Sequence, residues 1–416
     1  MHEEDWVNLR QEIMEAFTPG TPINETELFA GRQDVVQKLQ DIVIEPGRHA
    51  VIYGGRGVGK TSLANTFYRP LNKATRPILA ERINCDVGDT FDSLWRKVFR
   101  RLKYTGADGS ASWADQAHPE PIAPDDVVAE FSAFNSSLCP IVILDEFDRI
   151  HDQKCKDLTA DTIKALSDFT VNCTVIIVGV AKSISDLIAS HASITRAMAQ
   201  VQMERMKRNE MEAIIAVRSE RLGMSFDQGA LWRITYFSAG LPFFTHSFGK
   251  HAALRAIAEK RKRVTEQDVF SAMRDCLEDV DYSMRESYVK ATEKIYRKEN
   301  LFPQVLTACA LADADSIGRF TAVGIENPLS EIMGRDMKSS AFGFHLNELT
   351  RPERGSVLEK TGERRTYRFQ FSDPRMQPYI VMQSLDAGLI TAEALASYEL
   401  KPQREFSLPT SSQPQQ

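Results

Sequence analysis

The chain has 416 residues, 43% of them hydrophobic, and a net charge of −6 at pH 7, which suits two or three globular domains and excludes a general nucleic-acid coat. Its six cysteines form neither a Cys-x-x-Cys pair nor a zinc pattern with histidine, so we expect neither a zinc site nor a disulfide framework. No apolar run is long enough to cross a bilayer, and the acidic start Met1–Asp5 is unlike a signal peptide, so the sequence predicts a cytoplasmic protein without membrane binding.

The first predicted elements are two helices separated by a linker. Residues 5–18 predict a short amphipathic helix, which the proline pair in Pro19–Pro22 must end. A second helix follows Phe29–Arg32 and places apolar residues from Val35 to Ile42 on one face, which is typical of a core helix. In the lead-in to this helix, Phe29 is a candidate for contact with an adenine base.

A glycine-rich run then separates an apolar strand, residues 49–53, from a helical segment. It fits the phosphate-loop pattern G-x-x-x-x-G-K-[ST], in which glycines let successive backbone N–H groups turn toward phosphates beside a helix N-terminus. Lys60 is then expected to reach the β- and γ-phosphates, and the Thr61 hydroxyl to bind Mg²⁺. The predicted nucleotide-binding residues of this loop are Gly54, Gly55, Arg56, Gly57, Val58, Gly59, Lys60, Thr61 and Ser62.

Two carboxylates follow a later apolar strand. Residues 141–144 are all apolar, which suits a strand buried on both faces, and Asp145 and Glu146 come at its carboxyl end, where open parallel sheets bind ligands. We predict that Asp145 holds Mg²⁺ and that Glu146 is the general base for an attacking water. An acidic pair after a strand also begins ordinary turns, so this prediction depends on the phosphate loop upstream.

Further strands and helices alternate around these motifs. Residues 77–85 and 173–180 read as strands and 159–169 as a helix, which together indicate a parallel sheet covered on both faces, whereas 105–126 reads as a surface insertion. After the last of these strands, Lys182 or Ser183 either senses the γ-phosphate or caps the next helix. Arg196 is either an arginine finger for a neighbouring subunit's nucleotide or a solvated residue at a helix end.

The second half of the chain reads first as helices and then as helices with a hairpin. Gly240-Leu241-Pro242 separates two of the helices, and the hairpin is expected to alternate Tyr367, Phe369 and Phe371 inward, as in a winged helix-turn-helix. Between Arg351 and Arg368 there are six basic and three acidic residues, which suggests contact with double-stranded DNA, although winged helices also dock proteins. The predicted parts are an N-terminal helix and linker (1–24), a nucleotide-binding core (25–205), a helical lid (206–280), a winged helix (281–390) and a disordered tail (391–416).

Taken together, these motifs resemble an AAA+ P-loop ATPase of the origin-recognition-like and STAND-like branch, which includes bacterial transposon target-selection ATPases. The resemblance covers about residues 25–385 and implies an α/β fold, in which a P-loop parallel sheet covered by helices precedes a helical lid and a winged helix. It also implies ATP and Mg²⁺ as cofactors, hydrolysis to ADP and phosphate, and assembly into a homo-oligomer when ATP binds. By the same resemblance Glu146 is the hydrolytic base and Arg196 the arginine finger.

Two departures from that family pattern affect the expected activity. The usual sensor asparagine is not evident after the 173–180 strand, and Phe243-Phe244 follows Pro242 where many members place a sensor arginine. We therefore expect slow hydrolysis, with ATP acting as a switch that couples to DNA binding or assembly. The alternative is a STAND-like signalling or anti-phage defence regulator that controls a partner protein. A third reading, a nucleotide-binding scaffold, predicts no turnover and no effect of Glu146→Gln.

Overall fold

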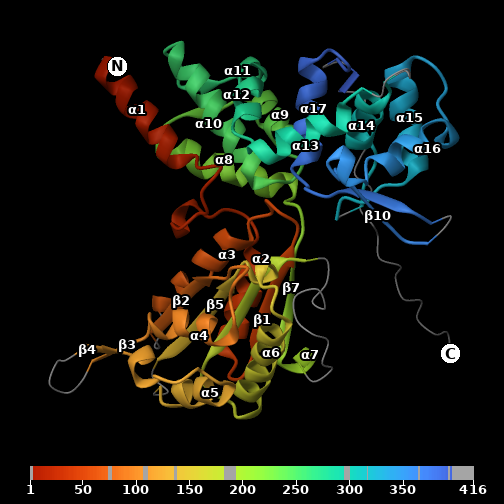
Figure 1. Ribbon diagram of the computed structural model, residues 1–416. Coiled ribbons are helices and arrows are strands. Elements are labelled where there is room, and N and C mark those ends of the chain that lie inside the picture. The colour runs from red at the N-terminus through yellow and green to blue at the C-terminus, as the bar shows by residue number, and fades with distance from the viewer. Residues whose placement is uncertain are drawn as a thin grey trace, which may run out of the picture. The chain divides into compact units, whose positions relative to one another are not determined.

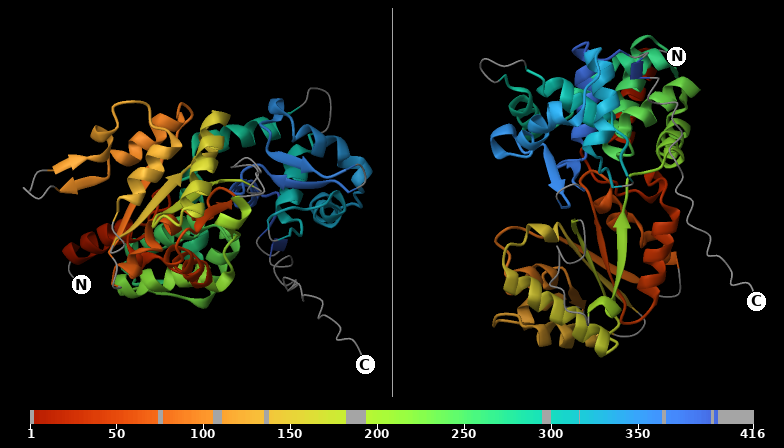
Figure 2. Two further views of the ribbon diagram at one scale, coloured as in Figure 1. Left: turned by 90° about the horizontal axis from the view of Figure 1, so that it is seen from below. Right: turned by 90° about the vertical axis from the view of Figure 1, so that its right-hand side faces the viewer.

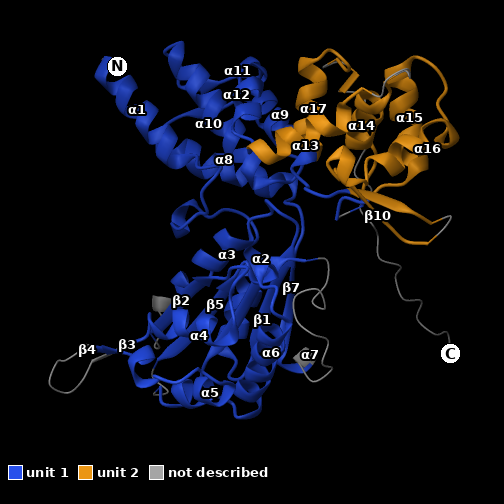
Figure 3. Ribbon diagram, viewed as in Figure 1, with its two compact units in different colours: residues 1–281, 315–319, 371–376 blue, residues 282–314, 320–370, 377–416 orange. Residues whose placement is uncertain are grey.

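The computed structural model describes residues 3–73, 77–105, 111–134, 138–181, 194–294, 300–315, 317–363, 366–391 and 394–395. The chain divides into two compact units (Figure 3). Unit 1 comprises residues 1–281 with two later segments, 315–319 and 371–376, and unit 2 comprises the rest. Within the described residues, no helix is long and apolar enough to cross a membrane.

Unit 1 is built on a five-stranded parallel sheet with the order β2-β5-β6-β1-β7. Its strands are β1 (His49–Gly54), β2 (Ile78–Asn84), β5 (Cys139–Asp145), β6 (Thr174–Val180) and β7 (Met198–Met203). The sequence predicted four of these strands and missed β7. Met198 and Met203 of β7 are buried. Because β7 mixes methionine with glutamine, it lacks the β-branched apolar run that marks the other strands.

Helices cover both faces of the sheet, as predicted, and the right-hand view of Figure 2 shows the sheet between the two layers. One layer contains α4 (Phe91–Phe99), α5 (Pro124–Ser132) and α6 (Gln153–Asp168). Its large side chains, among them Trp95, Phe131 and Ile163, pack with alternate strand residues in one buried cluster. The other layer contains α2 (Gln33–Ile44) and α3 (Lys60–Thr66), which contact β1 and β6.

The stretch 105–126 is more than the surface insertion that we expected. It contains the second strand of a small antiparallel pair, β3 (Lys103–Thr105) with β4 (Ala111–Trp113), and the short 3₁₀ helix Ala114–Ala117. Ala114 and Ile122 are buried in the core of the α4–α6 layer. Elements this short carry no readable hydrophobic period, which is why the sequence pattern did not reveal them.

The remaining helices of unit 1 form a separate layer, which we call the helical layer (Figure 1). It consists of α8 (Arg208–Leu222), α9 (Gln228–Ser238), α10 (Pro242–Ala258), α11 (Glu266–Ser271) and α12 (Met273–Glu278), all of which lie within residues 206–280. The N-terminal helix α1 (Glu3–Ala16) packs against α8 and α10. Buried Arg218 fixes this arrangement, since its guanidinium donates to the carbonyl oxygens of Ala16 and Leu28 at 2.9 and 3.0 Å.

Unit 2 combines helices with a two-stranded sheet. Its elements are α13 (Tyr282–Thr292), α14 (Phe302–Leu311), α15 (Ala322–Met333), α16 (Ser339–Glu348), β10 (Leu358–Thr361), β11 (Arg368–Phe371) and α17 (Met376–Asp386). Phe320 adds an antiparallel bridge to Phe369 of β11. Phe369 and Phe371 are buried as predicted, but the prediction for Tyr367 was wrong, because its side chain is 37% exposed beneath the Lys360 ammonium. The predicted disordered tail lies outside the described residues from 396 onward.

Candidate functional site

The residues predicted to bind nucleotide gather at one edge of the unit 1 sheet. β1 and β5 belong to the same parallel sheet, so their carboxyl ends, Gly54 and Asp145, lie at the same edge. The phosphate loop continues from Gly54 and leads into α3, whose first residue is Lys60. This parallel geometry brings two motifs that are far apart in the sequence onto one site.

Glycine is required at the start of the loop because β7 passes close to it. Gly54 has φ +152°, and a Cβ atom at this position would collide with the carbonyl oxygen of Met203. Further along, Gly57 and Gly59 have φ values of +75° and +92°, in the left-handed region that favours glycine. Gly54 and Gly55 do not line the cavity itself, whereas Arg56 to Ser62 do.

We expect Gly54→Ala to lower the melting temperature by at least about 5 °C, since the new methyl group must push β7 away from β1. Thermal unfolding followed by circular dichroism measures this. Gly20→Ala is the matched control, because a Cβ at Gly20 meets nothing within 4 Å. Equal melting temperatures for the two variants would contradict the close approach of β7 to Gly54.

Lys60 is a buried cation held by backbone carbonyls. The residue is 9% exposed, and its Nζ donates to the carbonyl oxygens of Gly54 and Gly55 at 3.0 and 2.7 Å. Burial lowers the pKa of Lys60 to about 8, against the opposing pull of Asp148 and Asp145. A buried ammonium with only neutral hydrogen-bond partners is a strong site for an anionic group.

Thr61 and Asp145, the two predicted metal ligands, line the same cavity. Asp145 is buried, with 3% of the residue exposed. Burial raises the pKa of Asp145, while the Thr61 hydroxyl and the backbone N–H of Glu146 (2.9 Å) oppose the rise. A hydroxyl and a carboxylate at this position are the oxygen donors that suit Mg²⁺, so the residues present fit the predicted ion.

Glu146 lines the same cavity and forms an ion pair with Arg149, which also lines it. It adopts a left-handed conformation with φ 57° directly after β5, and its side chain is 49% exposed. Its carboxylate pairs with Arg149 at 2.9 Å. The neighbouring Asp148 accepts a hydrogen bond from the N–H of Val180, at the end of β6. The predicted base is therefore at the expected edge of the sheet, tied to a cation on its own turn.

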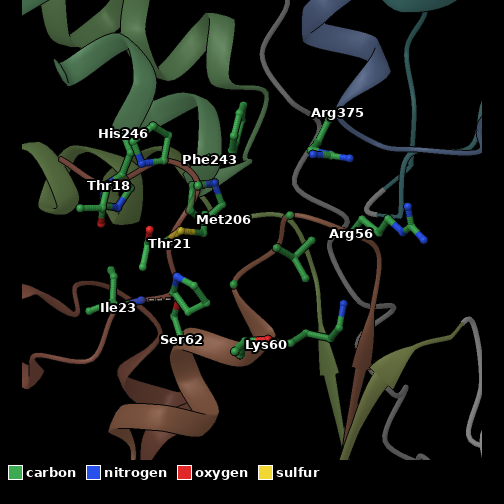
Figure 4. Close-up of a pocket in the computed structure, with 18 of the residues that line it drawn as sticks. Thr18, Thr21, Ile23, Arg56, Lys60, Ser62, Met206, Phe243, His246 and Arg375 are labelled. Atoms are coloured by element: carbon green, nitrogen blue, oxygen red, sulfur yellow. Dashed lines mark hydrogen bonds between the residues drawn. The ribbon is translucent and has the colours of Figure 1, made fainter. Parts of the chain in front are cut away.

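The cavity that these residues border has a volume of about 640 Å³, within the range of small-molecule sites, and two ends of different character. Figure 4 shows Lys60, Arg56 and Arg375 on one side and Thr18, Ile23 and His246 on the other. We call the first side the phosphate end and the second the base end. Every residue that lines the cavity belongs to unit 1. The cavity is also lined by Thr21, Phe29, Met206, Ile214 and Phe243.

The cavity lining includes the predicted Phe29 and, at the base end, a histidine that the sequence analysis missed. His246 is 3% exposed, and its Nδ1 has no hydrogen-bond partner among the described residues. Burial holds the pKa of His246 well below its ordinary value, so the ring is neutral and offers one donor and one acceptor nitrogen. His246 stands one helical turn after Pro242 on α10, and a lone histidine in a helix gives no sequence signal.

Arg32 has a structural role that its place in the predicted lead-in did not reveal. The side chain is buried, and its Nη2 donates to the carbonyl oxygens of Val58 and Glu204 at 3.1 and 2.6 Å. Arg32 therefore ties the phosphate loop to the end of β7 and fixes the shape of the loop.

Arg196 lies away from this cavity. It is an exposed residue of the short helix α7 (Ile194–Ala197), directly before β7 begins at Met198. Because Met198 pairs with His49 at the start of β1, Arg196 is at the opposite edge of the sheet from the phosphate loop. It cannot reach the phosphates of its own chain, so both predicted alternatives remain, an arginine finger for a neighbouring subunit's nucleotide or a solvated residue at a helix end. Lys182 and Ser183, the sensor candidates, lie outside the described residues.

Comparison with known proteins agrees with this architecture. Residues 28–172 match the family described as AAA ATPase domain, while no curated protein matches the chain in sequence. The ORC2 protein of Aeropyrum pernix, solved as ADPNP–ADP complexes, is 14% identical, with 90% of this chain and 98% of that chain covered at a TM-score of 0.51.

Two further solved structures align less closely. The Aeropyrum pernix ORC1 protein in complex with DNA is 14% identical, with 90% and 97% of the two chains covered and a TM-score of 0.48. The Thermotoga maritima RuvB Holliday junction branch migration motor is 16% identical, with 83% and 93% covered and a TM-score of 0.44. From the family match and the ORC2 likeness, we conclude that residues 28–172 are similar to the AAA ATPase domain family and that the chain has an α/β AAA+ fold like that of ORC2.

Proposed function

We propose that the chain binds ATP with Mg²⁺ in this cavity and hydrolyses it to ADP and phosphate. The observation that carries the proposal is that buried Lys60, Thr61 and buried Asp145 line one cavity, because this joins the two motifs at one point. Lys60 would exchange the carbonyl oxygens of Gly54 and Gly55 for phosphate oxygens, which are stronger acceptors. Bound at Thr61 and Asp145, the ion would neutralise charge on the β- and γ-phosphates.

The base end supports adenine as the base. Phe29 and Met206 offer apolar contact area for a flat ring. The neutral imidazole of His246 can exchange a hydrogen bond with the polar edge of the base, which would satisfy its unpartnered Nδ1. The two ends together match the two halves of a nucleotide.

For hydrolysis, Glu146 would accept a proton from water as the water oxygen bonds to the γ-phosphorus and the bond to the ADP oxygen breaks. The ion pair with Arg149 has to open before the Glu146 carboxylate can do this. This requirement supports slow turnover and a switch-like use of ATP. Arg196 of a neighbouring subunit would stabilise the transition-state charge.

The affinity for ATP should fall as pH rises above about 8. Since burial holds the pKa of Lys60 at about 8, the nucleotide-free protein loses this positive charge above that pH. Bound phosphates raise the pKa again, so binding then requires proton uptake and weakens by up to about tenfold per pH unit. Below pH 8 this contribution is constant. Titration calorimetry from pH 7 to 9.5 measures the effect, and Lys60→Ala should show no such slope.

Unit 2 supports DNA as a ligand through the order of its elements. Helix α14, the Phe320 bridge, α15, α16 and the strands β10 and β11 follow the order of a winged helix-turn-helix. Arg351 and Lys360 are exposed or half-exposed near this sheet. Arg354 is different, because it is buried and donates to the carbonyl oxygens of Lys290 and Glu293. The basic surface therefore contains fewer residues than the six counted in the sequence. Two of those six, Arg364 and Arg365, lie outside the described residues.

We expect the double variant Lys360→Glu with Arg368→Glu to weaken duplex DNA binding at least about tenfold at low salt, because phosphate contacts dominate such affinity. Fluorescence anisotropy over a salt series measures this, and the slope against salt should also decrease. Lys290→Glu on α13 is the control, since it makes half of this charge change at an exposed lysine of unit 2 that lies on a helix outside the two-stranded sheet. Unchanged binding in the double variant would show that DNA does not bind at this surface.

The overall function is tested by measuring ATP hydrolysis and assembly mass with and without duplex DNA, for the parent and for Glu146→Gln. We expect ATP-dependent assembly in both proteins and turnover in the parent alone. If the parent neither assembles nor responds to DNA, the proposed coupling is wrong. No described residue favours the alternative of a signalling or defence regulator.

A further inference from the structure

A segment late in the chain lies on the phosphate loop. Residues 371–376 belong to unit 1, although their neighbours in sequence belong to unit 2. A Cβ built at Gly55 would be 3.0 Å from Cγ of Pro374, and one built at Gly57 would be 3.3 Å from Cγ of Arg375. The loop glycines therefore leave room for this segment as well as for phosphates.

Arg375 is the charged residue that this segment brings to the cavity. It lines the phosphate end together with Lys60 and Arg56 (Figure 4). Its side chain is 18% exposed, and its guanidinium carbon lies 5.9 Å from the ring centre of Phe243. Phe243 occupies the place in which the sequence lacks a sensor arginine, so Arg375 supplies a guanidinium beside that place from a different part of the chain.

Two carboxylates hold Arg375. Its Nη2 pairs with Asp373 at 2.7 Å and with Asp281 at 2.9 Å. The planar guanidinium fork binds phosphate oxygens in the same way that it binds carboxylates. A phosphate that arrives at this end of the cavity therefore competes directly with Asp281 and Asp373 for the same donors.

We propose that Arg375 binds the γ-phosphate of ATP held by its own chain, and that Asp281 and Asp373 retain it when that phosphate is absent. The inference rests on the proposed function, which places ATP in this cavity. Phosphate loops use their backbone N–H groups for the α- and β-phosphates, and their lysine reaches the β- and γ-phosphates. Arg375 lies against Gly57 and lines the cavity at the same end as Lys60, which assigns it to the outer phosphate.

This exchange would report the nucleotide state to unit 2 through the chain itself. Arg375 directly precedes α17, and Asp281 directly precedes α13, both of which belong to unit 2. Their ion pair thus joins two of the points where the chain passes from one unit to the other. When the γ-phosphate takes Arg375, that pair opens, and when hydrolysis removes the phosphate, it closes again.

The test is the dissociation constant for a non-hydrolysable ATP analogue and for ADP, measured by titration calorimetry on the full chain. Arg375→Gln should weaken binding of the analogue about tenfold or more and change ADP binding less than about threefold. Asp281→Asn should tighten analogue binding about threefold, because it removes one competitor for the guanidinium. A residue that only braces the fold would weaken binding in both variants, and to the same extent for both nucleotides.

Controls separate this inference from the proposed function. Arg255→Gln removes another arginine from an ion pair, with Asp275 at 2.6 Å on the helical layer, and should leave both constants unchanged. If Lys60→Ala binds ATP normally, the proposed function itself is wrong. If Lys60→Ala loses binding while Arg375→Gln and Asp281→Asn match the parent for both nucleotides, only the role of Arg375 is overturned. Should Arg375→Gln fold poorly, the tightening by Asp281→Asn still decides the question.

Discussion

Lys60→Ala is expected to raise the dissociation constant for ATP at least about 100-fold, the largest effect of any single change on binding. Lys60 is the buried cation of the phosphate end, and its ammonium already sits between the carbonyl oxygens of Gly54 and Gly55. In the variant, the phosphates lose a charge-assisted hydrogen bond in a site with little water to replace it. ATP hydrolysis should be lost with binding at ordinary ATP concentrations.

Titration calorimetry with ATP and Mg²⁺ measures this change. Lys38→Ala is the matched control, because Lys38 also donates to a backbone carbonyl, that of Gln200 at 2.7 Å, but is itself exposed and does not line the cavity. Circular dichroism should show that both variants keep the parent fold. Equal affinities for Lys60→Ala and Lys38→Ala would mean that nucleotide binds elsewhere.

Glu146→Gln is expected to lower the turnover number by about 10² to 10⁴ while ATP binding changes little. The amide cannot accept the proton of the attacking water, which accounts for the loss of rate. Binding should persist because the Glu146 side chain is half-exposed and pairs with Arg149 in the nucleotide-free protein. Single-turnover measurements with saturating ATP separate the two effects.

The control for Glu146 is Glu212→Gln. Glu212 is likewise a partly exposed glutamate paired with an arginine close in sequence, Arg208 at 2.8 Å, but it lies on α8 away from the cavity. Turnover should be unchanged in this variant. If Glu146→Gln kept full turnover, another group would have to be the general base. If the parent itself showed no turnover, the protein would be a nucleotide-binding scaffold without ATPase activity.

The sequence predicted the parts of the fold that carry a strong local pattern. The apolar runs of β1, β5 and β6 can only be buried strands, and the helices of the helical layer have clear ends at residues such as Gly223 and Pro242. β7 was missed because its pairing with β1 depends on a partner far away in the sequence. Tyr367 was placed wrongly because alternation gives the face of a strand but not how far the covering layer extends.

In the candidate site, too, the residues within local motifs could be predicted, and the single residues outside them could not. Lys60, Thr61 and Asp145 stand in motifs whose spacing reflects backbone geometry around phosphates, so their chemistry can be read locally. His246, Arg32 and Arg375 are single residues from three distant segments, and only the folded chain brings them to one cavity. No spacing rule links Arg375 to a loop more than half the chain away.

The most direct measurement is a crystal structure of the full chain with a non-hydrolysable ATP analogue and Mg²⁺. We expect the β- and γ-phosphates at Lys60, the metal ion at Thr61 and the base beside Phe29 and His246. A structure in which Lys60 still donates to the carbonyl oxygens of Gly54 and Gly55, with the nucleotide bound elsewhere, would contradict ATP binding in this cavity.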